Sequence, residues 1–164
     1  MAERFQRITP FLWFKDDAED AVRFYVSVFQ NSRIGQITRY SKESSNASGQ
    51  PEGSVMTIAF ELDGQSFTAI NGGPHFTFTE AVSFVVNCRT QEEIDYYWEQ
   101  LSEGGDPKSQ ICGWLKDRFG LSWQVTPSDL GALMSDPDTT AAVMKEVLGM
   151  KKIDLAVLRR AAGK

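Results

Sequence analysis

The same order of elements occurs twice in this sequence: a β-strand, an amphipathic helix and then further strands. The first copy has a strand over 8–14 and a helix capped by Asp16 or Asp17, and the second has a strand over 81–86 and a helix that begins at Thr90. Apolar residues recur at helical spacing in both helices: Ala18, Ala21, Val22, Tyr25, Val28 and Phe29 in the first, and Ile94, Tyr97, Trp98 and Leu101 in the second. Because one helix and a few strands cannot bury a whole sheet face alone, this repeat predicts two copies packed together.

Further strands complete the first copy. Residues 34–40 alternate weakly and predict a short strand, and 55–62 and 66–71 predict a hairpin around Asp63-Gly64, a favoured two-residue turn. Between them, residues 41–53 have almost no apolar content, which predicts a mobile surface loop.

A second hairpin completes the second copy. Two apolar and aromatic runs, 111–116 and 121–126, flank a four-residue turn that starts at Asp117 and ends at Gly120. Pro127 cannot donate to a strand ladder, so the second strand is expected to end there.

These patterns predict the α+β class, with paired βαβββ modules and a C-terminal helical extension in a single domain over 1–164. The modules are expected at about 5–74 and 78–127, and the extension at 128–164, with helices starting near Asp136 and Lys152. In each module the helix covers one sheet face. The uncovered faces are expected to curve into a concave cavity.

Composition narrows the classes of partner. Hydrophobic residues make up 41% of the chain, charged residues 24%, and the net charge is −5, so nucleic acid is not an expected partner. Residues 1–7 lack the apolar core of a signal peptide and no long apolar run appears, which predicts a cytoplasmic protein with no membrane partner. The chain has two cysteines, expected to be reduced, and one histidine, so a cluster of imidazole ligands is excluded within one chain.

Several motifs carry a family resemblance. They are Ile-Thr-Pro-Phe-Leu-Trp-Phe at 8–14, Ala-Glu-Asp-Ala at 18–21, Phe24-Tyr25, Cys-Gly-Trp-Leu-Lys-Asp-Arg-Phe-Gly-Leu-Ser-Trp-Gln-Val-Thr-Pro at 112–127, and Met-Lys-Lys-Ile-Asp at 150–154. On these residues the chain resembles the PhnB-like proteins, some labelled 3-demethylubiquinone-9 3-methyltransferase, of the vicinal oxygen chelate superfamily. That superfamily includes glyoxalase I, bleomycin-resistance proteins and extradiol dioxygenases. The resemblance implies paired βαβββ modules that form a cupped sheet, and commonly a homodimer.

The resemblance also implies where a metal would bind. Metal-using members place their ligands on the first and last strand of each module, and here those positions are Thr9, Thr68, Ala81 or Ser83, and Gln124. None is a histidine or a carboxylate, and neutral hydroxyls and an amide are poor ligands for a divalent ion. We therefore expect no metal and no cofactor.

The methyltransferase label has little support in the residues. A methyltransferase that uses S-adenosylmethionine would be expected to have a Gly-rich turn from strand to helix. This chain has only Gly72-Gly73 and Gly104-Gly105, at a hairpin end and a helix end.

Eight residues are candidate pocket-lining, ligand-binding residues: Thr9, Phe11, Trp13, Thr68, Ser83, Cys112, Trp114 and Gln124. Thr9, Phe11 and Trp13 share one strand face, which is expected to face the cavity if Leu12 and Phe14 face the helix. Simple core filling is the alternative for these aromatic residues. Of Trp114 and Trp123, one is expected to line the pocket and the other to lie in the core.

The charged trio at 116–118 resembles a catalytic set, but its place at a turn favours a solvated or turn-forming role. The catalytic residues are unknown. The expected function is binding of a small apolar or aromatic molecule by a metal-free protein. The alternatives are an enzyme, either a metal-dependent lyase or dioxygenase or a methyltransferase, and a dimerisation scaffold.

Overall fold

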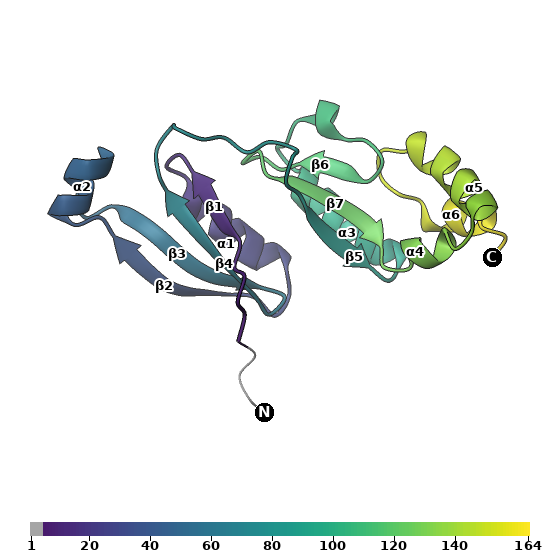
Figure 1. Ribbon diagram of the computed structural model, residues 1–164, viewed down its shortest axis with the longest axis horizontal. Coiled ribbons are helices and arrows are strands. Elements are labelled where there is room, and N and C mark those ends of the chain that lie inside the picture. Colours follow the sequence, from purple (N-terminus) through teal and green to yellow (C-terminus); the bar gives the residue numbers. More distant parts are fainter. Residues whose placement is uncertain (1–4) are drawn as a thin grey trace. The chain divides into compact units, whose positions relative to one another are not determined.

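The computed structural model describes residues 5–164, which divide into two compact units, one ending at Thr77 and the other spanning Phe78–Lys164 (Figure 1). The first unit contains strands β1 (Phe11–Phe14), β2 (Arg33–Arg39), β3 (Val55–Leu62) and β4 (Gln65–Asn71), with helices α1 (Ala18–Val28) and α2 (Lys42–Ser48). Its strand order is β1-β4-β3-β2. Strand β1 runs parallel to β4 and the other pairs are antiparallel, which is a βαβββ module.

Helix α1 packs across one face of this sheet (Figure 1). Its apolar stripe is buried from Ala18 to Val28, whereas Phe29 follows the helix and is half-buried. Leu12 and Phe14 of β1 are buried as the alternation predicted. Phe11, on the other face of β1, is 57% exposed. The open face of the sheet therefore begins with Phe11 and Trp13.

The start of α1 is not capped as the sequence predicted. Asp17 occupies the cap position, but its side chain makes no capping hydrogen bond. The Ala18 N–H instead donates to Oδ1 of Asn71, at the end of β4, over 2.9 Å. Asn71 also donates from Nδ2 to the carbonyl of Val55 and accepts on its own carbonyl from the Tyr40 hydroxyl. Asn71 thus joins the helix start to β4, β3 and the residue that follows β2.

The prediction of a loop over 41–53 was wrong for its first half, because residues Lys42–Ser48 form α2. The Ser41 hydroxyl accepts from the Ser44 N–H in a reciprocal capping box, and Gly49 ends the helix in the left-handed region with φ of 75°. No residue of α2 is buried. Local capping, rather than an apolar stripe, defines this helix.

The hairpin around Asp63-Gly64 is confirmed. Both residues have positive φ, 46° and 74°, as a two-residue turn with the twist of the flanking strands requires.

The second unit contains strands β5 (Phe84–Cys88), β6 (Trp114–Lys116) and β7 (Ser122–Pro127), with helices α3 (Gln91–Ser102), α4 (Leu130–Leu133), α5 (Pro137–Leu148) and α6 (Leu155–Ala161) and a 3-10 turn, η1 (Pro107–Ser109). The strand order is β5-β7-β6, with β5 parallel to β7 and β6 antiparallel to it. Helix α3 packs on β7, β5 and β6 (Figure 1). The structure confirms the α+β class and the two related modules.

The second module has one strand fewer than the first. The residues that precede β6 form η1 and a single bridge between Ile111 and Trp114. The predicted strand over 111–116 is short because Cys112 and Gly113 both have positive φ, 54° and 82°. The predicted strand over 81–86 also lies later, at Phe84–Cys88, because a turn joins the Val82 N–H to the Thr79 carbonyl.

The C-terminal helices belong to the second unit, where α5 packs against α6 and α4. Asp136 caps α5 as predicted, whereas the last helix begins at Leu155, after the cap Asp154, rather than near Lys152. The Gln91 amide fixes this connection, because Nε2 donates to the Ile153 carbonyl and Oε1 accepts from the Leu155 N–H. Within residues 5–164, no helix has both the length and the apolar character that a membrane crossing requires.

Candidate functional site

A cavity of about 490 Å³ lies beside β6 in the second unit. Its walls come from β6, the start of β7, η1 and the segment before β5, and the lining residues are Glu80, Lys108, Ser109, Ile111, Cys112, Trp114, Leu115, Lys116 and Ser122. We call it the β6 cavity. Its volume lies within the range of ordinary small-molecule sites.

Strand register explains why side chains gather here. Trp114 lies opposite Gln124 and Lys116 opposite Ser122, and residues two apart on a strand point to the same face. Leu115 and Trp123, at the alternate positions, are buried on the other face. Trp114, Lys116, Ser122 and Gln124 therefore share the open face of the second sheet.

Cys112 reaches the cavity through a left-handed turn. The N–H groups of Cys112 and Gly113 donate to the carbonyls of Met150 and Lys151, each over 2.8 Å. A Cβ at Gly113 would lie 2.9 Å from the Val125 carbonyl oxygen, so glycine is required there for close packing as well as for its φ. The C-terminal segment thus holds one wall of the cavity.

Ser122 is the unusual polar residue of the cavity. It is 1% exposed, and its Oγ has no hydrogen-bond partner among residues 5–164. A buried hydroxyl without a partner costs about 1–3 kcal/mol, and such groups in native proteins are rare. A hydroxyl of this kind in a cavity wall is suited to a polar group of a ligand.

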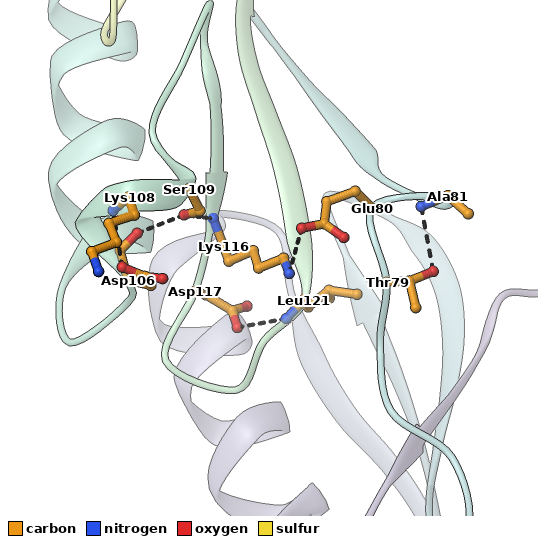
Figure 2. Close-up of polar contacts among 9 residues, drawn as sticks. All are labelled: Thr79, Glu80, Ala81, Asp106, Lys108, Ser109, Lys116, Asp117 and Leu121. Atoms are coloured by element: carbon orange, nitrogen blue, oxygen red, sulfur yellow. Dashed lines mark hydrogen bonds and ion pairs between the residues drawn. The ribbon is translucent and has the colours of Figure 1, made fainter.

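An ion pair forms part of the cavity wall. Lys116 Nζ lies 2.5 Å from Glu80 Oε1, and Figure 2 shows the two side chains pointing toward one another. The hydrogen bond from Lys116, followed by a backbone hydrogen bond, holds the pKa of the Glu80 carboxyl below its usual value. The Lys116 N–H donates to Ser109 Oγ, which fixes η1 against β6 (Figure 2).

Asp117 forms the turn between β6 and β7, which was one of its two predicted roles. The other predicted role, a solvated side chain, does not apply to it. It is 3% exposed, and its Oδ1 accepts from the N–H groups of Phe119 and Leu121 (Figure 2 shows the bond to Leu121). Its Oδ2 accepts from Nε1 of Trp123 over 2.8 Å. The carboxylate is engaged in folding the hairpin, and it does not line the cavity.

The structure distributes the eight candidate residues over both units. Cys112 and Trp114 line the β6 cavity, while Ser83 accepts a hydrogen bond from Gln124 on the same sheet's open face. Thr9 and Thr68 line a separate cavity of about 410 Å³ in the first unit. Phe11 and Trp13 line neither of these cavities: Trp13 donates from Nε1 to the Gly73 carbonyl and packs edge-on against Phe76.

Sequence reasoning missed Ser122 and assigned no role in binding to Lys116 or Glu80. The signal for Ser122 was available, since it lies two residues before Gln124 on the same strand face. Its burial without a partner is visible only in the folded unit.

The side chains of these sites do not fit a divalent metal. The β6 cavity offers one carboxylate, already paired with a lysine, and one thiol, while the positions expected from the resemblance carry hydroxyls and an amide. No three His, Cys, Asp or Glu side chains gather in the described part of the chain in a way that could hold a metal ion.

The two cysteines differ sharply in exposure, which gives a simple check of the cavity. Cys88 is fully buried, and burial followed by the charge of Glu93 raises the pKa of its thiol to about 12, whereas Cys112 is half-buried in the cavity wall. At pH 8 a thiol reagent is expected to modify one thiol per folded chain and two in denaturant. Cys112→Ser should abolish the reaction of the folded protein, and fast reaction of that variant would contradict the assignment.

Each unit packs a helix on one face of its sheet, as expected for the glyoxalase fold. The family described as 3-demethylubiquinone-9 3-methyltransferase matches residues 6–126, and the chain belongs to this family. The match ends before the helical extension, so the motif at 150–154 lies outside it. Curated proteins gave no match.

One solved structure supports this assignment, and two others share the fold. A putative 3-demethylubiquinone-9 3-methyltransferase, a PhnB protein from Bacillus cereus, is 40% identical over 74% of this chain and 99% of its own, with a TM-score of 0.62. A protein from Pseudomonas aeruginosa is 19% identical over 75% of this chain and 98% of its own, with a TM-score of 0.57. The fosfomycin resistance protein FosX from Mesorhizobium loti, 15% identical over 83% of this chain and 100% of its own with a TM-score of 0.54, shares the fold.

The family's description implies a methyl donor, but the residues do not fit S-adenosylmethionine. Among the described residues, four turns lead directly from a strand to a helix, and none contains glycine: Lys15-Asp16-Asp17, Tyr40-Ser41, Arg89-Thr90 and Ser128-Asp129. Gly72-Gly73 follows β4 and Gly104-Gly105 follows α3, so neither pair opens a helix.

Proposed function

We propose that this protein binds a small, largely apolar or aromatic organic molecule in the β6 cavity, without the help of a metal ion. The observation that carries the proposal is the buried Ser122 hydroxyl, unpaired among the described residues, in the wall of a cavity that also presents an indole ring.

The apolar part of the ligand would pack against Trp114. This side chain is half-buried in the cavity wall, and Ile111 beside it is 57% exposed. Aromatic rings stack or meet edge to face with a gain of about 0.5–1.5 kcal/mol beyond the area that they bury. A flat apolar molecule is therefore the best complement to this wall.

The polar part of the ligand would meet Ser122. A hydroxyl can donate one hydrogen bond and accept others, so it suits a carbonyl, carboxyl or hydroxyl group. The combination of one apolar wall and few polar groups is typical of small-molecule sites.

Titration with small aromatic compounds, followed by tryptophan fluorescence, tests the proposal. We expect quenching with a dissociation constant below about 1 mM for compounds that carry a polar substituent on one ring. The change should be lost in Trp114→Phe and kept in Trp98→Phe, whose indole lies on α3 and outside the cavity lining. Quenching that persists in Trp114→Phe but disappears in Trp98→Phe would place the ligand elsewhere.

Ser122→Ala is expected to separate binding from stability. Removal of a buried hydroxyl that lacks a partner should raise the free energy of unfolding by about 1 kcal/mol, while ligand affinity falls about tenfold. Ser83→Ala is the matched control, because the Ser83 hydroxyl is paired with Gln124 and its loss should lower stability instead. A Ser122→Ala variant that binds as tightly as the parent chain would refute the role of the hydroxyl.

A further inference from the structure

We infer that the β6 cavity takes an organic anion, an aryl or alkyl carboxylate, and that Glu80 holds the place of the ligand's carboxylate on Lys116 when no ligand is bound. This inference rests on the proposed function and names the class of molecule that the same cavity binds.

The charges around the cavity favour an anion. Two lysines, Lys108 and Lys116, and one acid, Glu80, are among its lining residues. Lys116 comes from a sheet strand, with its side chain 28% exposed, whereas Glu80 comes from the segment before β5 and its side chain is 65% exposed. The cation therefore belongs to the framework of the site, and its present partner lies at the surface.

The Glu80–Lys116 pair is of a kind that a ligand can replace. Ion pairs with an exposed partner contribute about 0–1 kcal/mol, because water competes for both groups. A carboxylate that also packs an apolar body against Trp114 gains contacts that Glu80 does not make. Exchange of one carboxylate for another keeps Lys116 paired throughout.

The position of Ser122 gives the ligand's carboxylate a second donor. Ser122 lies directly opposite Lys116 in the β6–β7 register, and side chains at such positions start about 5 Å apart on one face. A carboxylate has two oxygens, so it can accept from the ammonium and from the hydroxyl together. Binding an anion would thus satisfy the Ser122 Oγ–H while it displaces Glu80.

Calorimetric titration of phenylacetate and its neutral analogue phenylacetamide tests the inference. The parent chain should bind the carboxylate about tenfold more tightly than the amide. Lys116→Met should remove this preference, and Glu80→Gln should strengthen carboxylate binding about threefold or more with no effect on the amide. Lys145→Met and Glu103→Gln, on exposed positions outside the cavity, are the charge-matched controls and should leave both affinities unchanged.

The outcomes separate this inference from the proposed function. Equal binding of both compounds, with no effect of Lys116→Met or Glu80→Gln, would overturn the anion inference and leave the binding proposal standing. If neither compound binds at up to about 10 mM, the anion inference is overturned. If neutral aromatic compounds cause no quenching in the fluorescence titration, the proposed function is overturned. The Glu80→Gln result carries particular force, because a gain in affinity cannot come from partial unfolding.

Discussion

Replacement of Asp117 with alanine is expected to lower the free energy of unfolding of the second unit by about 3–5 kcal/mol. The carboxylate is buried and accepts hydrogen bonds from the Phe119 and Leu121 N–H groups and from Trp123 Nε1. Alanine would remove the carboxylate acceptor of the buried Trp123 indole N–H and would release the turn between β6 and β7. Urea denaturation followed by tryptophan fluorescence measures the loss.

Asp106→Ala is the matched control for this prediction. Asp106 also forms a turn, but it is exposed and its side chain accepts from a single N–H, that of Lys108. Its removal should cost less than about 1 kcal/mol. Asp117→Asn keeps the oxygen that faces the two backbone donors, so its loss of stability should lie between those of Asp117→Ala and Asp106→Ala. Equal losses for Asp117→Ala and Asp106→Ala would contradict the burial of Asp117.

Ile153→Ala is expected to destabilise the second unit by about 2–4 kcal/mol. Ile153 is 2% exposed, although it lies outside the part of the chain that the family match covers. Its side chain lies beside Gly113, and its carbonyl accepts from Gln91 on α3. Loss of this packing should also loosen the neighbouring turn, so Cys112 should react faster with thiol reagents.

Leu148→Ala is the control for Ile153→Ala, since Leu148 is 67% exposed and should change stability by no more than about 0.5 kcal/mol. Chemical denaturation of the two variants gives the comparison. A loss at Ile153 as small as that at Leu148 would mean that the C-terminal segment is not part of the core of the second unit.

Much of the fold could be predicted because its signals are local. The hairpin at Asp63-Gly64, the apolar stripe of α1 and the cap of α5 each need only a few neighbouring residues. Helix α2 was missed because it has capping residues but no apolar face. The third strand expected in the second module is absent from residues 103–113, where glycines and Pro107 favour turns and η1 instead.

The candidate site could be predicted only in part, because sequence patterns report local structure and most of the site's contacts are not local. Trp114 and Gln124 were both among the candidate pocket residues, and they are partners in the β6–β7 register. The Glu80–Lys116 pair joins segments that are distant in sequence. The burial of Asp117 and the unpaired Ser122 hydroxyl depend on how the β6–β7 hairpin folds. No local pattern carries that information.

Asn71 has a consequence for synthesis of the chain. Helix α1 leaves the ribosome about 40 residues before Asn71 does, at a translation rate of roughly 5–20 residues per second. For those seconds the Ala18 N–H lacks its native acceptor, the Asn71 side chain. The helix therefore becomes fully anchored only when the last strand of its unit arrives, and a nascent chain stalled before that strand would present a frayed helix to chaperones and proteases.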